Sequence, residues 1–202
     1  MTARVLIVYP EIFACQSKFD RKVSQILSRL TCFEVIHQGD PNGFISAFFA
    51  EDERVGALQE VSSLETAQVT HAVVFDDGEE FAELRNDLKQ AGIPLRWIKI
   101  KITRVINLKR EPEFEGMKST AAYEYIGRGS YWGNPHSMHE EGESREEVIR
   151  KYQYDFEYNK FIKIDPTRVH ELAGKRLGCF CKPAPCHGDV LADFLNRYDD
   201  GE

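Results

Sequence analysis

Long apolar runs are absent from this chain of 202 residues. A membrane-spanning helix needs about 20 consecutive, mostly apolar residues, and no stretch of the sequence approaches that length. Residues 1–4 run directly into an apolar segment, without the basic flank and the small-residue cleavage site of a signal peptide. We therefore expect a cytoplasmic protein with no membrane partner.

Positive charge is also in short supply, since 26 Lys and Arg face 33 Asp and Glu and the net charge is -7. A large nucleic-acid-binding face needs clustered Lys and Arg to neutralise phosphates, so we do not expect a nucleic acid partner. A small anionic ligand in a local pocket is compatible with this balance. The five cysteines are an odd number, which in a reducing compartment favours free thiols, metal ligands or nucleophiles over disulfides.

The first half of the sequence alternates short apolar runs with helical periodicity. The apolar runs cover residues 5–9, 33–36, 72–75 and 95–100, and helical spacing follows the first and third of them. Strands that alternate with helices predict a parallel sheet with helices on both faces. The fold class predicted for this half is therefore α/β.

The second half has a different sequence pattern, and we place the domain boundary at residues 101/102. Ser144 and Glu147 form a capping-box pattern that predicts a helix, and Asp165 followed by Pro166 predicts the start of another. A short strand at 175–180 and a final helix at 189–198, with Phe194 among its buried residues, complete the pattern. Residues 102–202 are predicted to form a smaller α+β domain after the parallel-sheet domain of residues 1–101.

Three thiols and one imidazole lie within nine positions near the end of the chain, at Cys179, Cys181, Cys186 and His187. Their number is sufficient for a tetrahedral zinc site. Their C-x-C and C-x4-C spacings differ from the usual C-x2-C knuckle, so two alternatives stay open. Cys179 and Cys181 are also compatible with small buried side chains on a strand.

The second alternative is chemical, because Cys186, His187 and Asp189 stand where the final helix begins. The free amides of a helix N-terminus lower the pKa of a thiol and attract phosphate or carboxylate. In this interpretation the three are catalytic residues, with His187 as general acid or base and Asp189 orienting it. Plain helix capping by Asp189 is an equally good explanation of that residue.

A glycine-rich, aromatic loop at residues 127–135 is the second candidate site. Its glycines let backbone amides approach an anion, Arg128 offers a planar fork for phosphate, and Tyr131 or Trp132 is able to stack on a base. Alternatively, the aromatic side chains fill a small core and residues 134–135 make a turn. In the first half, Gly39 and Gly43 follow a strand and precede an expected helix, the position where open parallel sheets bind ligands.

Two elements resemble an uncharacterised bacterial and phage domain family. The elements are G-R-x-S-x-W-G-N-P at residues 127–135 and G-K-x-L-G-C-x-C-x-P-x-x-C-H-G-D at residues 174–189. The resemblance names no reaction. It implies a shared site or scaffold for eight residues: Arg128, Ser130, Trp132, Asn134, Cys181, Cys186, His187 and Asp189.

The first half is similar to the SLOG superfamily of Rossmann-like domains, on the basis of residues 39–43 after the second strand and 76–78 before a helix. This resemblance implies a Rossmann-like fold and a nucleotide-derived ligand. The P-G-G-x-G-T loop of the LOG enzymes is missing, so we expect ligand binding rather than their phosphoribohydrolase activity.

Together these patterns predict a protein that binds a nucleotide or a nucleotide-derived metabolite, such as an ADP-ribose-like signal. Arg128, Ser130, Tyr131, Trp132, Asn134, Gly39 and Gly43 are the predicted ligand-binding residues. Hydrolysis or transfer of this ligand at Cys186, His187 and Asp189 is left open. The alternative is a non-enzymatic interaction module, in a phage-encoded protein, in which zinc is the cofactor. The sequence indicates no oligomeric state.

Overall fold

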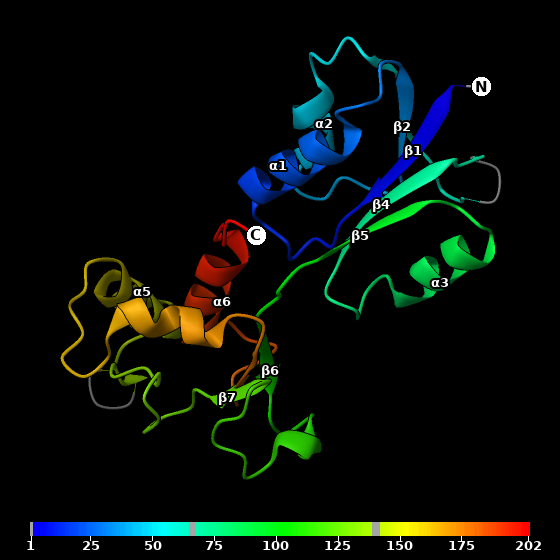
Figure 1. The fold of residues 1–202 in the computed structure, drawn as a ribbon. Coiled ribbons are helices and arrows are strands. Elements are labelled where there is room, and N and C mark those ends of the chain that lie inside the picture. The colour runs from blue at the N-terminus through cyan, green and yellow to red at the C-terminus, as the bar shows by residue number, and fades with distance from the viewer. Residues whose placement is uncertain (1, 65–67, 139–141) are drawn as a thin grey trace. The chain divides into compact units, whose positions relative to one another are not determined.

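The computed structural model describes residues 2–64, 68–138 and 142–202 (Figure 1). The chain divides into two compact units, Met1–Ile100 with Asp199–Glu202, and Lys101–Tyr198. Among the described residues, no helix is both long and apolar enough to cross a membrane.

The first unit is a five-stranded parallel sheet in the order β3-β2-β1-β4-β5, which confirms the predicted α/β class. Its strands and helices follow one another along the chain, with these bounds: β1 Ala3–Val8, α1 Gln16–Leu27, β2 Phe33–His37, α2 Phe44–Phe49, β3 Val55–Glu60, β4 His71–Asp76, α3 Ala82–Gln90 and β5 Leu95–Lys99. No apolar run in the sequence predicts strand β3, because it is an edge strand and none of its residues is buried.

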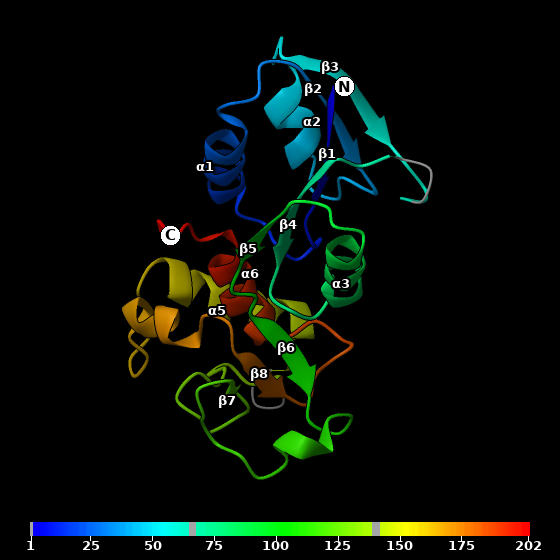
Figure 2. The same ribbon diagram turned by 45° about the vertical axis from the view of Figure 1, so that its right-hand side comes forward.

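Helices cover both faces of this sheet, as Figure 2 shows for α1 and α2 on one side and α3 on the other. Successive side chains of a strand point to opposite faces. Accordingly Leu6 and Val74 pack in one cluster with Leu88 of α3. The ring of Phe75 stacks on Phe19 of α1, with 5.2 Å between their centroids.

Asp40 organises the turn that follows β2. Its carboxylate accepts hydrogen bonds from the amides of Ile45 and Ser46 at the start of α2, at 3.0 and 2.8 Å. The Tyr9 hydroxyl donates to the same carboxylate at 2.5 Å. Gly43, the residue before α2, has a φ of 72°, a conformation that glycine adopts without strain.

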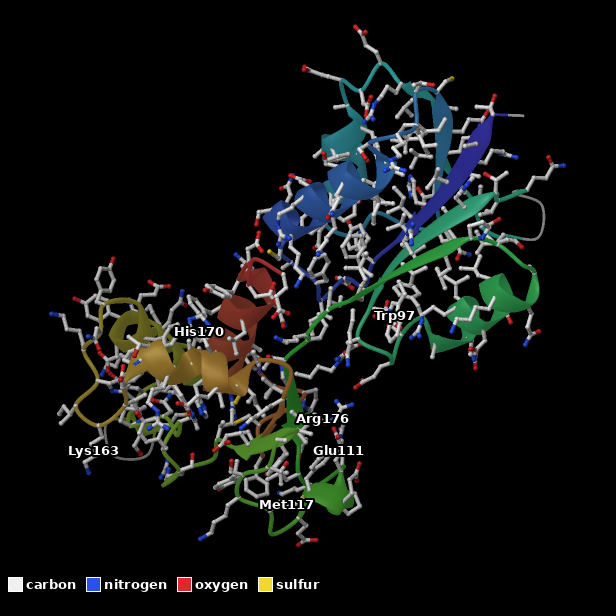
Figure 3. All side chains as sticks on the ribbon, viewed as in Figure 1. Trp97, Glu111, Met117, Lys163, His170 and Arg176 are labelled. Atoms are coloured by element: carbon white, nitrogen blue, oxygen red, sulfur yellow. The ribbon has the colours of Figure 1, made fainter. Side chains whose placement is uncertain are left out.

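The second unit has a three-stranded parallel sheet in the order β6-β8-β7, with side chains drawn in Figure 3. Its elements have these bounds: β6 Arg104–Asn107, η1 Pro112–Phe114, β7 Tyr123–Tyr125, α5 Arg145–Glu157, η2 Pro166–Leu172, β8 Arg176–Cys179 and α6 His187–Arg197. Helix α5 begins at the predicted capping box of Ser144 and Glu147. The helix predicted after Asp165 is present as a 3-10 helix, with Asp165 as its cap and Pro166 in its first turn. The expectation that Phe194 is buried was wrong, since this side chain is 39% exposed and its ring packs against that of Phe156.

Candidate functional site

The end of β8 and the start of α6 bring the thiols of the second unit together. Strand β8 ends at Cys179, and Cys186 is the residue that caps α6. One donor atom from each of Cys179, Cys186 and His187 lies within 4.8 Å of the other two, and all three side chains are buried. The Cys181 sulfur lies 3.5 Å from that of Cys179. The structure therefore brings three of the four predicted metal-ligating residues into one compact group, with Cys181 beside Cys179 at its edge.

His187 presents one particular nitrogen to the thiols. Its Nε2 lies 2.9 Å from the Ile126 carbonyl, which can only accept, so Nε2 carries the proton. Burial is the main cause that lowers the pKa of His187, which favours the neutral ring. Its Nδ1 lone pair is then left facing the Cys186 sulfur, 3.6 Å away.

The three thiols do not ionise alike. A hydrogen bond from the Cys186 thiol is the main cause that lowers the pKa of Cys179 to about 5, in opposition to its burial. Donation to Cys179, followed by burial, raises the pKa of Cys186. Burial, followed by the nearby Cys179 thiolate, raises the pKa of Cys181. Among these three sulfurs Cys179 has the lowest pKa.

Asp189 acts on the backbone of α6. Its carboxylate accepts from the Cys186 amide at 2.8 Å and pairs with Lys182 at 2.6 Å. These contacts are the helix capping that the sequence allowed as an alternative. The Ile126 carbonyl orients the imidazole of His187. The described hydrogen bond and ion pair of Asp189 are with Cys186 and Lys182.

Two cavities lie beside this cluster. The smaller, of about 120 Å³, is lined by the thiols, His187, Arg128 and Arg145. The larger, of about 510 Å³, lies against the loop that contains Arg128 and Tyr131. Asn134 and His136 line both cavities, as does Arg128, so the two are neighbours with a common wall.

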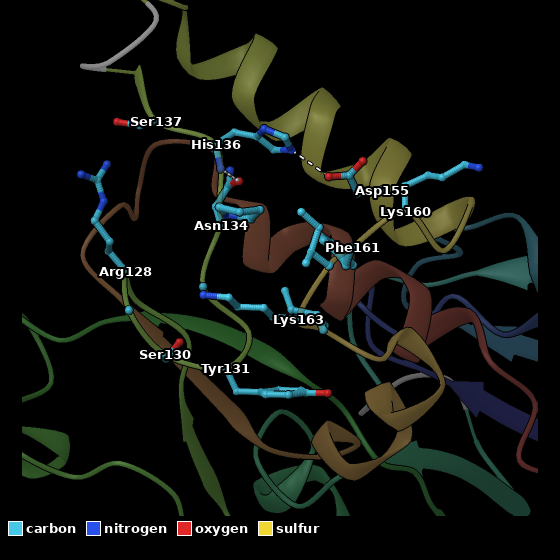
Figure 4. Close-up of a pocket in the computed structure, with 15 residues that line it drawn as sticks. Arg128, Ser130, Tyr131, Asn134, His136, Ser137, Asp155, Lys160, Phe161 and Lys163 are labelled. Carbon is cyan, nitrogen blue, oxygen red and sulfur yellow. Dashed lines mark hydrogen bonds and ion pairs between the residues drawn. The ribbon is translucent and has the colours of Figure 1, made fainter.

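Basic side chains surround the larger cavity (Figure 4). Lys160 and Lys163 line it together with Arg128. Within the described ranges, no side-chain hydrogen bond or ion pair engages any of these three cations. The buried hydroxyl oxygen of Ser130 also has no hydrogen-bond partner among the described residues. An anion with a hydroxyl or phosphate oxygen would find both charge and hydrogen-bonding groups here.

The other loop residues named from the sequence divide between the cavity and the core. Tyr131 is 40% exposed and lines the larger cavity, while its hydroxyl accepts from the Asp165 amide at 2.9 Å. Trp132 is 3% exposed and belongs to the core, where its carbonyl accepts from Tyr152 at 3.0 Å. The Asn134 amide donates to the Val148 carbonyl of α5 at 3.0 Å and so fixes the loop.

Sequence reasoning missed the pair formed by His136 and Asp155. Their side chains lie 2.9 Å apart in the wall of the larger cavity, one from the loop and one from α5. It also missed Lys160 and Lys163. No local pattern identifies these residues, because only folding brings residues 155–163 next to residues 128–136.

Gly39 and Gly43 lie in the first unit, at the turn after β2.

Several glycines of the two motifs are needed for close packing. A Cβ on Gly178 would lie 2.3 Å from the hydroxyl of Tyr123, and one on Gly133 would lie 2.6 Å from the carbonyl oxygen of Gly127. A Cβ on Gly188 would lie 2.4 Å from the side chain of Ile126. These glycines let β7, β8, α6 and the loop approach one another.

Comparisons with known proteins identify both halves. Residues 2–106, which are 105 of the 202 residues, match the minimal SLOG domain, and residues 106–197 match a domain of unknown function, DUF4326. The chain belongs to the minimal SLOG domain family, and its second unit carries the DUF4326 match. Both resemblances inferred from the motifs are confirmed. No solved structure matches the chain.

A relative is found in a phage. Over 73 residues the chain is 42% identical to an uncharacterized 12.4 kDa protein in the nrdA-td intergenic region of Enterobacteria phage T4. The matched region is 36% of this chain and 66% of the phage protein. The link to phage proteins is thereby confirmed.

Proposed function

We propose that the second unit binds a nucleotide-derived metabolite, of the ADP-ribose kind, in the cavity of about 510 Å³ that lies against the loop of Arg128 and Tyr131. The observation that supports this most strongly is the set of three basic side chains, Arg128, Lys160 and Lys163, around a cavity of about 510 Å³. Small-molecule sites commonly have volumes of about 300–1,000 Å³. The ring of Tyr131 supplies a face for a base, and the cations supply partners for phosphates.

The membership of the first half in the SLOG family supports the same ligand class, because SLOG domains are associated with nucleotide-derived ligands. Gly39 and Gly43 are candidates for a ligand site in that unit, at the carboxyl side of β2. The proposal for the larger cavity depends on the second unit alone.

Isothermal titration with ADP-ribose and with pyrophosphate tests the proposal. Arg128→Gln should weaken binding of both ligands by about tenfold or more, since a charged hydrogen-bonding pair contributes about 1.5–3 kcal/mol. Arg150→Gln is the matched control, an exposed arginine of α5 outside the lining of either cavity. Equal affinities for the two variants, or no binding by the wild type, would reject the site.

Chromatography of the titrated mixture tests for turnover. A new product would make the protein a hydrolase or transferase, with Cys186, His187 and Asp189 as the catalytic residues proposed from the sequence. Unchanged ligand would make it a binding protein.

The thiol cluster supports a second candidate function, zinc binding. With Zn–S near 2.3 Å and Zn–N near 2.0–2.1 Å, a tetrahedral site has S···S edges of about 3.8 Å and S···N edges of about 3.6 Å. The Cys186 sulfur lies 3.6 Å from His187 Nδ1, which matches an S···N edge, and Cys179 completes a set of three donors within 4.8 Å of one another. A neutral imidazole whose other nitrogen donates to a carbonyl is the form that ligates zinc.

Zinc at this position would link β8, the following loop and α6. The second unit would then be a binding module stabilised by the metal. Metal analysis of protein purified without chelator should find one zinc per chain in the wild type. Cys186→Ser should lose it, whereas Cys32→Ser, at an exposed cysteine of the first unit, should retain it. A wild-type protein that stays metal-free after incubation with zinc would exclude this function.

A further inference from the structure

Cys181 stands apart from the other three residues of the cluster. Cys179, Cys186 and His187 are buried and their donor atoms are mutually close, but Cys181 is half-buried and lies outside that group. Its sulfur lies 3.5 Å from that of Cys179 and also interacts with the Cys186 thiol and with Arg145. Three donors are therefore mutually close, and Cys181 approaches two of them without completing a compact set of four.

The three gathered donors, together with Cys181, line the smaller cavity. Its volume of about 120 Å³ is enough for a few water molecules, or for one small oxyanion. Arg128 and Arg145 line the same cavity, so an anion next to the donors would meet positive charge. His136 adds a further hydrogen-bonding group to its wall.

We propose that Cys179, Cys186 and His187 form a three-ligand zinc centre whose fourth position is exchangeable and takes an oxygen of a small anion from the smaller cavity. This inference depends on the zinc binding proposed above. Structural zinc sites are closed by four protein ligands, whereas reactive sites keep three and leave one position for water or substrate. Arg145 and Arg128 then hold the anion, and Cys181 is a neighbour of the metal rather than a ligand.

Cobalt(II) substitution of the full chain tests this inference, with inorganic phosphate as the probe. The wild type should bind one Co²⁺, and phosphate should shift its visible ligand-field bands, because an oxygen of phosphate enters the fourth position. Arg145→Gln should need about tenfold more phosphate for the same shift, while Arg150→Gln, on the same helix, should behave as the wild type.

Cys181→Ser separates the two geometries. In a three-ligand centre the variant keeps its Co²⁺, its sulfur-to-cobalt charge-transfer intensity and its response to phosphate. If Cys181→Ser loses the charge-transfer intensity of one thiolate, the site has four protein ligands and the inference is overturned. Wild-type bands that do not respond to phosphate would overturn it in the same way. A folded wild type that takes up no Co²⁺ would overturn the zinc proposal together with it.

Discussion

Replacing Gly188 by alanine should strain the junction between α6 and the loop of the second unit. The new Cβ would lie 2.4 Å from the Cδ1 atom of Ile126 and 3.2 and 3.3 Å from the two methyl groups of Val105. Ile126 is fully buried, so its side chain has no open space to move into. The same residue's carbonyl holds His187, so a shift of Ile126 would also disturb the thiol cluster.

The expected free energies follow from packing. Inserting a methyl group into a filled core costs about 1–3 kcal/mol. The gain in helix propensity from glycine to alanine, up to about 1 kcal/mol, offsets part of this. Ile126→Val alone removes Cδ1 and costs about 0.5–1.5 kcal/mol. In the double variant the shortest contact is gone, so its destabilisation should be less than the sum of the single values by about 1–3 kcal/mol.

Urea unfolding of the four proteins measures this coupling. Each unit contains one of the two tryptophans, so a Trp97→Phe background makes the fluorescence report on Trp132 and the second unit. Additivity of the two single changes to within about 0.5 kcal/mol would refute the packing explanation. Contacts with Ile126 and Val105 would then not be the reason why residue 188 is a glycine.

Two further predictions concern pH and metal. Burial raises the pKa of Asp40, but hydrogen bonds from Tyr9 and from the amides of Ser46 and Ile45 outweigh it and lower the pKa overall. A lowered folded-state pKa contributes stability above the unfolded value of about 3.9, and this contribution is lost as the pH falls through the folded value. Thermal unfolding should therefore show that Asp40→Ala costs about 0.5–2 kcal/mol at neutral pH, because the amides at the start of α2 lose their acceptor, and that it flattens the acid dependence. An unchanged acid limb would contradict this. Removal of zinc by a chelator should lower the unfolding midpoint of the second unit. Adding zinc at about 100 times its Kd should restore about 2.7 kcal/mol of unfolding free energy. A midpoint that changes with neither treatment would argue against a resident metal.

Much of the fold was predictable because the buried parallel strands are continuous apolar runs. β1 and β4 lie between two layers of helices, and their sequences show it. β3 is an edge strand with mostly exposed side chains, so its pattern resembles that of a loop. In the same way the capping box of Ser144 identified α5, since helix caps depend on a few neighbouring residues.

The site was predictable only where its residues are close together in the sequence. The thiols and His187 fall within one short segment, so their clustering needed no knowledge of the fold. Tyr131 and Trp132 are adjacent, yet one lines the cavity and the other fills the core, which only the packing of α5 decides. Lys160 and Lys163 had no motif because single lysines in the connection between α5 and η2 form no sequence pattern.

The glycine-rich loop and the thiol cluster are linked by direct contacts. The loop of residues 126–136 is held at its start by the hydrogen bond from His187 to Ile126 and at its end by the contacts of Asn134 and His136 with α5. Replacing His187 would therefore disturb both the metal donors and the loop that carries Arg128. Loss of ligand binding in such a variant would not reveal which role had been removed. Arg145 and Cys181 line only the smaller of the two cavities and Lys163 lines only the larger, so variants of these residues test the two proposals separately.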